Sequence, residues 1–186
     1  MTHIRLDSET KIGHHIDALF GSGIFERLKV NHATGSFRFE YSRRTGRIKY
    51  FFIKDRLAGT IRTDGGIALT IIGANELLKT GKFLENCVKP IAEVVPFVMN
   101  GHSLFCKHVE WCGSNVKVGS EAVVIDNSCE VIAVGKAIIG AAHMKSYGQG
   151  VAVKIREGLK SPSTTTYSHD ARRQSGDETN VGQDGS

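Results

Sequence analysis

The stretch from Phe37 to Ile72 restricts the possible fold more than any other part of the chain. It opens with FRFEY at residues 37–41, where an aromatic side chain occupies every second position. A period of two is typical of a strand that buries one face. Turn sequences rich in glycine and charged residues follow, and they separate short apolar runs. The stretch therefore predicts an antiparallel meander of four strands, at residues 37–42, 47–53, 57–62 and 67–72.

Two helices are expected to flank this meander. Apolar residues recur at helical spacing between Ile12 and Phe20, after a capping residue at Asp7 or Ser8. A shorter helix is expected at residues 74–79. Helices packed on one face of an antiparallel sheet give an α+β domain, which we assign to residues 1–88.

A second β-rich block extends over residues 89–160. Its apolar runs are short and separated by glycine-containing turns, which is typical of a small barrel. Helical turns are expected at Pro96, where a missing N–H is tolerated, and at residues 143–147. Residues 161–186 are almost entirely polar and are expected to be disordered, because they cannot bury enough apolar surface to order the chain. The strands expected in the second block are 94–95, 104–111, 122–126, 131–139 and 151–156.

The charge of the chain points to an anionic partner. The 186 residues carry a net charge of +5, and residues 161–186 contain two cations and four anions, so residues 1–160 carry +7. A basic folded body attracts polyanions or acidic membrane surfaces. No run approaches the roughly 20 apolar residues that a membrane span needs. The start of the chain lacks the pattern of a secretory signal, so we expect a cytoplasmic protein that does not bind membranes.

The four cysteines do not match a metal site. Zinc ligands are usually paired two to four residues apart. Cys106 and Cys112 are six residues apart, and the sequence has no second closely spaced pair of cysteines. We expect buried free thiols, no metal and no cofactor. Cys106 and His108 would share one face of an expected strand at a separation of about 6–7 Å, too far for a nucleophile and its base. No glycine-rich phosphate loop occurs either, and no catalytic residue is assigned.

Four segments of the second block resemble PUA domains in the same order and spacing. They are residues 97–109 (FVMNGHSLFCKHV), 118–126 (VGSEAVVID), 132–137 (IAVGKA) and 150–156 (GVAVKIR). The resemblance implies a β pseudobarrel that binds structured RNA in the groove between its first helix and second strand.

Several residues are expected to form that groove. Gly101 has no Cβ, which lets an RNA backbone approach closely. The family often has arginine or lysine where this chain has His102. The resemblance places Gly101, His102, Leu104, Phe105 and Lys107 at the groove, and His102, Lys107, His108, Lys136 and Arg156 supply donors for phosphates.

The first block carries a second resemblance. Residues 45–52 (TGRIKYFF), 57–62 (LAGTIR) and 64–70 (DGGIALT) resemble the domain that precedes PUA in archaeal tRNA-guanine transglycosylases. Those enzymes exchange a base in the tRNA D-loop on the way to archaeosine. The resemblance implies tRNA binding, and no segment resembles the catalytic barrel of that family. We therefore expect a non-catalytic tRNA-binding protein, such as an accessory or split subunit that partners a transglycosylase catalytic subunit.

Basic residues gather at the ends of the expected strands in the first block. Long cations there supply sequence-independent contacts to an RNA backbone. They also protect an exposed sheet edge from aggregation, and both roles stay open. The residues are Arg43, Arg44, Arg47, Lys49, Lys54, Arg56 and Arg62, of which Arg44, Arg47 and Lys49 are assigned to RNA.

Two other functions are compatible with the sequence. PUA modules also occur in translation-associated adaptors that bind ribosomes or initiator tRNA, and a pure protein-interaction module ranks third. DNA is not expected as a partner. Identification of the partner distinguishes these functions.

Overall fold

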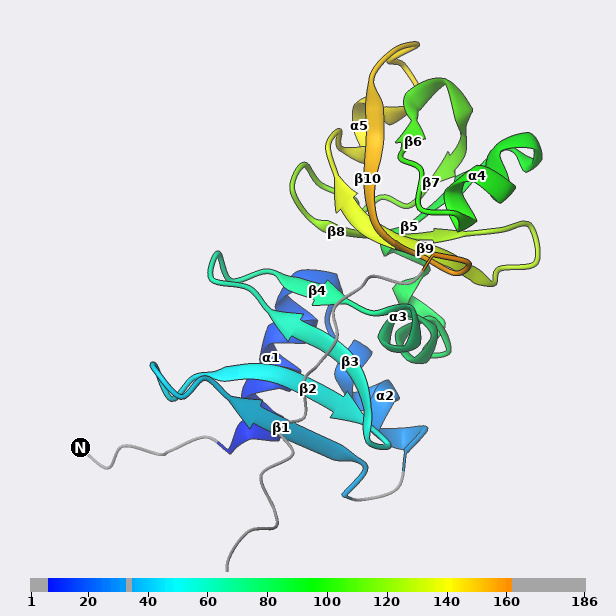
Figure 1. The fold of residues 1–186 in the computed structure, drawn as a ribbon. Coiled ribbons are helices and arrows are strands. Elements are labelled where there is room, and N and C mark those ends of the chain that lie inside the picture. Colours follow the sequence, from blue (N-terminus) through cyan, green and yellow to red (C-terminus); the bar gives the residue numbers. More distant parts are fainter. Residues whose placement is uncertain (1–6, 33–34, 162–186) are drawn as a thin grey trace, which may run out of the picture.

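The computed structural model describes residues 7–32 and 35–161, and its architecture is α+β (Figure 1). The tail predicted at residues 161–186 lies outside the described residues except for Ser161, which forms a bridge with Gly158. The first sheet is antiparallel in the order β1-β2-β3-β4. The predicted four-strand meander is therefore confirmed. Its strands are β1 (Phe37–Tyr41), β2 (Ile48–Ile53), β3 (Arg56–Ile61) and β4 (Ile67–Leu69).

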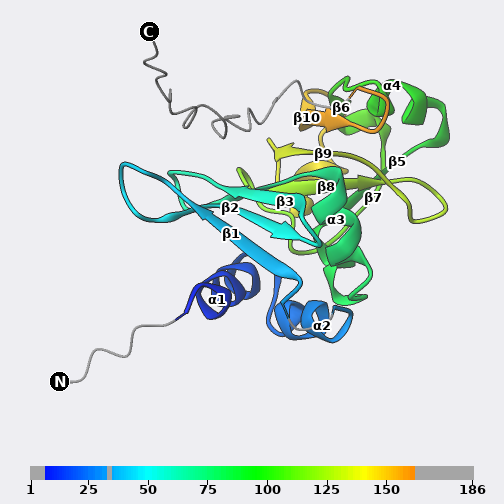
Figure 2. The same cartoon turned by 60° about the horizontal axis from the view of Figure 1, so that its bottom comes forward.

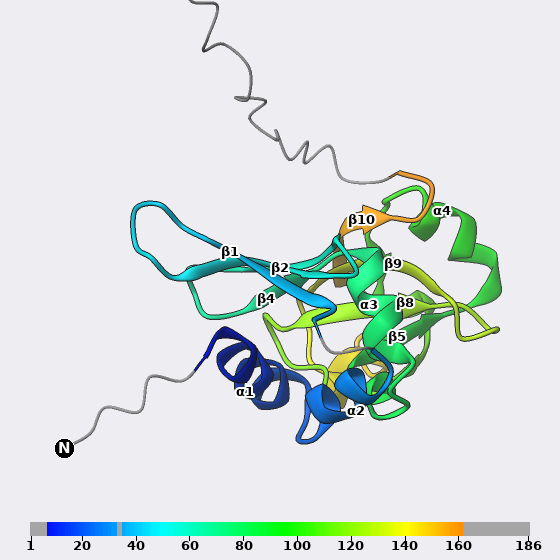
Figure 3. The same ribbon diagram turned by 90° about the horizontal axis from the view of Figure 1, so that it is seen from below.

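Two helices cover one face of this sheet (Figure 3). Helix α1 spans Ser8–Phe20 and is capped by Asp7, whose carboxylate accepts a hydrogen bond from the Thr10 amide at 2.7 Å. Helix α2 spans Ile24–Val30 and was not predicted. Its start is fixed by the carboxylate of Asp17, which accepts from two backbone amides of the turn between the helices. A seven-residue helix is too short to give a clear period, so tertiary contacts determine it.

The expected strand at residues 67–72 is too long. Strand β4 ends at Leu69, and helix α3 begins at Ile71 and runs to Leu78. Thr70 caps the helix, because its hydroxyl accepts from the Gly73 amide at 3.1 Å. Because the helix starts at this cap, the β-branched residues Ile71 and Ile72 belong to α3 and not to the strand that was expected there. Helix α3 then lies at the junction of the first sheet and the second (Figure 1).

The second sheet has the order β6-β10-β9-β8-β5-β7 and curls into a nearly closed barrel (Figure 2). Neighbouring strands within this sheet are antiparallel, except for the parallel pair β5 and β8. Strand β5 starts two residues before the expected domain boundary. The strands are β5 (Cys87–Pro90), β6 (Leu104–Phe105), β7 (Val109–Cys112), β8 (Glu121–Ile125), β9 (Val131–Ala137) and β10 (Val151–Gly158), and the helical elements are η1 (Lys82–Asn86), η2 (Ala92–Val94), α4 (Val95–Met99), η3 (Cys106–His108) and α5 (Ala141–Met144).

Two expected strands of this block are wrong. Residues 94–95 belong to η2 and α4, and Pro96 sits in the first turn of α4 as predicted. The expected strand 104–111 is interrupted by η3, so Cys106 and His108 do not lie on one strand face. The Cys106 amide bonds to the Gly150 carbonyl at the end of the β6–β10 pairing, and the chain then bends into a 3₁₀ turn.

Among the described residues, one of the two apolar cores is shared by the two domains. Strand β8 is buried on both faces. Val123 and Ile125 pack with apolar residues of α1, α2 and the first sheet, whereas Ala122 and Val124 point into the barrel. The first domain therefore packs against the outer face of the barrel. None of the described helices is long and apolar enough to cross a membrane.

Candidate nucleic-acid interface

The predicted groove residues gather at the junction of α4 and β6. Helix α4 ends in a turn at Gly101, whose φ of 89° lies in the left-handed region that glycine adopts at little cost. The Gly101 amide donates to the Val98 carbonyl and the His102 amide to the Phe97 carbonyl. The end of β10 presses against this turn, since a Cβ on Gly158 would lie 2.4 Å from the Met99 carbonyl oxygen. The turn is therefore held in a fixed shape.

The side chains at this junction form what we call the α4–β6 surface: Phe97, His102, Phe105, Lys107 and His108. The rings of Phe97 and His102 meet edge to face at 6.4 Å. Phe97 is 59% exposed and Phe105 is 46% exposed, and Lys107, two residues after Phe105, is exposed as well. Leu104 is buried in the barrel core and supports the surface from below. Sequence reasoning missed Phe97, because an aromatic on a short helix is usually a core residue.

Lys136 and Arg156 lie on the face of the second sheet that looks toward the first domain. Lys136 pairs across the ladder with Glu121 and with Lys154, and Arg156 bonds to Leu69 of the first domain. The sequence prediction joined these two cations to the Gly101 turn. Whether they contact RNA stays a prediction.

Arg156 already has internal partners. Its guanidinium donates to both carboxylate oxygens of Glu121 and to the Leu69 carbonyl, and Glu121 also accepts from the Leu69 amide at 2.9 Å. Burial raises the pKa of Glu121, and the Arg156 guanidinium opposes that rise. We call this group the Glu121–Arg156 bridge. It ties β4 of the first domain to the barrel.

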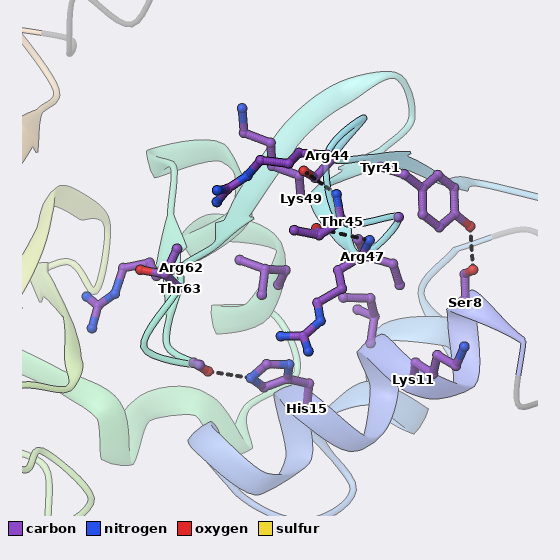
Figure 4. A pocket seen from close by; sticks show the side chains of 16 residues that line it. Ser8, Lys11, His15, Tyr41, Arg44, Thr45, Arg47, Lys49, Arg62 and Thr63 are labelled. Atoms are coloured by element: carbon purple, nitrogen blue, oxygen red, sulfur yellow. Dashed lines mark hydrogen bonds between the residues drawn. The ribbon is translucent and has the colours of Figure 1, made fainter.

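A second basic surface lies between α1 and the first sheet. It is a cleft of about 820 Å³, which we call the α1–sheet cleft (Figure 4). Its walls come from α1, the β1–β2 hairpin and the β3–β4 turn. None of the described residues that line it is an aspartate or glutamate. The cationic lining residues are Lys11, Arg44, Arg47, Lys49 and Arg62, and three of them, Arg44, Arg47 and Lys49, are predicted RNA contacts.

The cleft combines these cations with apolar and aromatic groups. Ile12, Ile48 and Ile61 contribute to its lining, and Tyr41 stands at one end with its hydroxyl bonded to Ser8. At the other wall the His15 Nε2 atom bonds to the Gly65 carbonyl oxygen, which ties α1 to the β3–β4 turn. The result is an amphipathic cleft with a cationic rim.

The charges of the cleft are unequally compensated. Arg62 forms a bidentate pair with Asp64, at 3.0 and 2.6 Å. That pair and the Gly66 amide lower the pKa of Asp64 to about 2, so Asp64 is ionised at neutral pH. Arg44 and Arg47 form no salt bridge with another described residue. The uncompensated positive charge therefore sits on the β1–β2 hairpin.

Sequence reasoning missed the α1 side of this cleft. Lys11 and His15 lie more than 25 residues before the hairpin, and Tyr41 was read only as a strand residue. Helical spacing did place Lys11 and His15 one turn apart on α1. Nothing in the sequence showed which element that side of the helix would face.

Among the described residues no group of three His, Cys, Asp or Glu side chains is placed to hold a metal ion. Cys87 and Cys106 are buried, as predicted, whereas Cys129 is exposed, contrary to the expected buried thiols. Cys129 lies in the β8–β9 turn with a φ of 60°.

Residues 92–159 match the family model described as PUA domain. The chain is 34% identical over 143 residues to the tRNA-guanine(15) transglycosylase of Methanothermobacter thermautotrophicus, a match that covers 76% of this chain and 21% of that enzyme. It is 28% identical to the enzyme of the same name from Methanobrevibacter smithii, with 83% and 23% covered. The chain thus spans about a fifth of the length of these curated relatives.

The solved structures show the same fold. A hypothetical protein of Pyrococcus horikoshii OT3 superposes with a TM-score of 0.62, at 18% identity, with 82% of this chain and 90% of that chain covered. This likeness extends over both domains.

Proposed function

We propose that this chain, whose residues 92–159 form a PUA domain, is a non-catalytic protein that binds tRNA. The observation that carries the proposal is the extent of the match to tRNA-guanine(15) transglycosylases. It covers most of this chain but only about a fifth of those enzymes, and most of their length has no counterpart in this chain.

The electrostatics of the described residues support an RNA ligand. The α4–β6 surface joins an exposed lysine, two histidines and two exposed aromatic rings around a glycine turn. Lysine and arginine supply most of the sequence-independent affinity for nucleic acids through phosphate contacts. Aromatic side chains stack on exposed bases. Gly101, His102, Phe105, Lys107 and His108 are therefore proposed as RNA contacts of the second domain.

The finer role that we propose is tRNA recognition for a separate catalytic subunit of archaeosine synthesis. A transglycosylase must hold a folded tRNA while one base is exchanged, and holding and exchange are separable tasks. On this proposal the chain supplies the first task. Co-purification of the chain with a transglycosylase catalytic subunit, in a tRNA-dependent manner, is the expected result for this role.

Filter binding of the full chain to transcribed tRNA tests the RNA-binding proposal. An unstructured RNA of equal length serves as the competitor. We expect the tRNA complex to survive competition and to weaken steeply with added salt, because bound cations release condensed counterions. Equal competition by the unstructured RNA, or a complex insensitive to salt, would overturn the proposal.

A pair of charge reversals assigns the contact surface. Lys107 is exposed in η3, directly after β6, and we expect Lys107→Glu to weaken tRNA binding about tenfold and to reduce the salt slope by about one. Lys117→Glu is the matched control, since Lys117 is exposed in the loop before β8, outside both basic surfaces. Equal effects of the two substitutions would contradict the assignment to the α4–β6 surface.

A further inference from the structure

We propose that the α1–sheet cleft binds one unpaired nucleotide of the RNA, with the base inside the cleft and its phosphates on the cationic rim. This proposal rests on the proposed RNA-binding function and deepens it. It assigns to the first domain a task different from that of the α4–β6 surface: reading an unpaired position in an otherwise structured RNA.

The size of the cleft suits a nucleotide rather than an isolated phosphate. Its volume of about 820 Å³ lies within the roughly 300–1,000 Å³ of typical small-molecule sites. A phosphate contact needs only a surface of donors, not an enclosed space between a helix and a sheet. Because α1 and the sheet flank the cleft, a single extruded nucleotide is the part of a structured RNA that we expect to enter it.

The lining suits a flat base. Ile12, Ile48 and Ile61 provide apolar surface that an aromatic heterocycle covers without losing hydrogen bonds. Tyr41 is 52% exposed, and its hydroxyl is bonded to Ser8 on α1. That bond holds the ring in place. An unpaired base stacks on such a ring, as single-stranded nucleic acids commonly do on aromatic side chains.

The rim suits the phosphates on either side of that base. Arg44 and Arg47 form no salt bridge with another described residue, and no described lining residue carries a carboxylate. Figure 4 shows Arg47 on the hairpin and His15 on α1 pointing into the cleft from opposite walls. Donors therefore surround the opening, and the carboxylate of Asp64, between the lining residues Thr63 and Gly65, is paired with Arg62. Negative charge and a flat apolar part occur together in a nucleotide.

The test uses two short RNA duplexes of identical sequence, one fully paired and one with a single bulged 2-aminopurine. We expect the full chain to bind the bulged duplex about tenfold more tightly. We also expect the 2-aminopurine fluorescence to fall on binding, because stacking on an aromatic ring quenches it. Tyr41→Ala should remove both effects. Tyr41→Phe keeps the ring and should retain them, which separates stacking from the hydroxyl bond to Ser8.

Two neighbouring arginines provide a matched charge control. Arg44 lines the cleft and Arg43 does not, although both are exposed in the same turn. We expect Arg44→Gln to weaken binding of the bulged duplex about fivefold to tenfold, and Arg43→Gln to leave it nearly unchanged. These two variants also keep the test decisive if Tyr41→Ala proves unstable.

The outcomes separate this proposal from the proposed function. Equal binding of the two duplexes, with no effect of Tyr41→Ala or Arg44→Gln, would overturn the cleft assignment even if tRNA still binds tightly. A tRNA complex that loses affinity in Lys107→Glu but not in the cleft variants would also overturn it. Failure to bind tRNA or either duplex would overturn both proposals and favour a protein partner.

Discussion

At the scale of single residues, the four cysteines occupy environments that differ in their access to water. Cys87 and Cys106 are buried, Cys112 is partly buried and Cys129 is exposed. Burial raises the pKa of the Cys112 thiol to about 11, and it raises the pKa values of Cys87 and Cys106 as well. Since the thiolate is the reactive form, these three thiols should react slowly for two reasons. Burial limits the access of reagents, and the raised pKa values leave little thiolate at neutral pH.

We therefore expect one cysteine to react quickly with a thiol reagent at pH 8. That cysteine is Cys129, and the other three should react only when the chain unfolds. Colorimetric titration with Ellman's reagent, with and without denaturant, measures the two populations. Cys129→Ser identifies the fast thiol by removing it. Fast reaction of two or more cysteines in the native protein would contradict the assignment.

At the scale of elements, helix α3 approaches strand β3 so closely that no side chain fits between them. A Cβ on Gly73 would lie 1.9 Å from the Ala58 carbonyl oxygen. That oxygen is backbone and also accepts from the Thr70 amide and hydroxyl, so it has little freedom to move. The glycine therefore sets the distance between helix and sheet, and with it the position of the first domain on the barrel.

We expect Gly73→Ala to lower the free energy of unfolding by about 3 kcal/mol, because the clash outweighs the helix propensity that alanine gains. Urea denaturation followed by circular dichroism measures the change. Gly148→Ala is the control, since Gly148 has no positive φ and a Cβ there meets nothing within 4 Å. That substitution should change stability by less than about 0.5 kcal/mol. A neutral Gly73→Ala would show that α3 can shift on β3.

At the scale of the whole molecule, the Glu121–Arg156 bridge joins the two domains through a buried carboxylate. The Glu121 side chain is 1% exposed and that of Arg156 is 35% exposed. The bridge sits beside the shared apolar core, where Val123 and Val134 of the barrel pack with residues of the first domain. The domains are therefore expected to unfold together, in one transition.

Removal of Arg156 alone should leave the buried Glu121 carboxylate without its cationic partner. We expect Arg156→Met to lower the free energy of unfolding by about 2–3 kcal/mol, which is at or below the low end of the roughly 3–5 kcal/mol for a broken buried pair, because the arginine is partly exposed. Adding Glu121→Gln should recover part of this loss, since the neutral amide no longer needs a cation. Urea denaturation followed by the fluorescence of Trp111, the only tryptophan, gives both values. Strictly additive losses in the double variant would show that the two side chains are not coupled.

This bridge also changes the meaning of an RNA-binding test at Arg156. From sequence, Arg156 is one more basic residue near a groove. In the structure, a substitution there disturbs the contact between the domains, so a loss of RNA binding would not identify a direct contact. Lys107 is the better residue for that purpose, because it is exposed and forms no salt bridge with another described residue.

The sequence by itself determined the meander, the first helix and the barrel strands β8, β9 and β10, whereas β5 was missed and β6 and β7 were predicted as one strand. These features depend on residues within a few positions of one another: the alternation at 37–41, the cap at Asp7 and the glycine turns. Three predicted RNA contacts, Arg44, Arg47 and Lys49, share one cleft because one hairpin carries them all. At Thr70 the signal was local but was misread, because the cap on the Gly73 amide starts a helix where a strand was expected. After Phe105 the chain bends into a 3₁₀ turn where the Cys106 amide bonds to the distant Gly150 carbonyl.

Only the tertiary structure decided which distant residues meet. Ser8 reaches Tyr41 across 33 positions, His15 reaches Gly65 across 50, and Arg156 reaches Leu69 across 87. These contacts follow from burying the apolar faces of the helices and sheets against one another, and that packing is a property of whole surfaces. The basic hairpin is therefore visible in the sequence, whereas the cleft that it forms with α1 exists only in the folded chain.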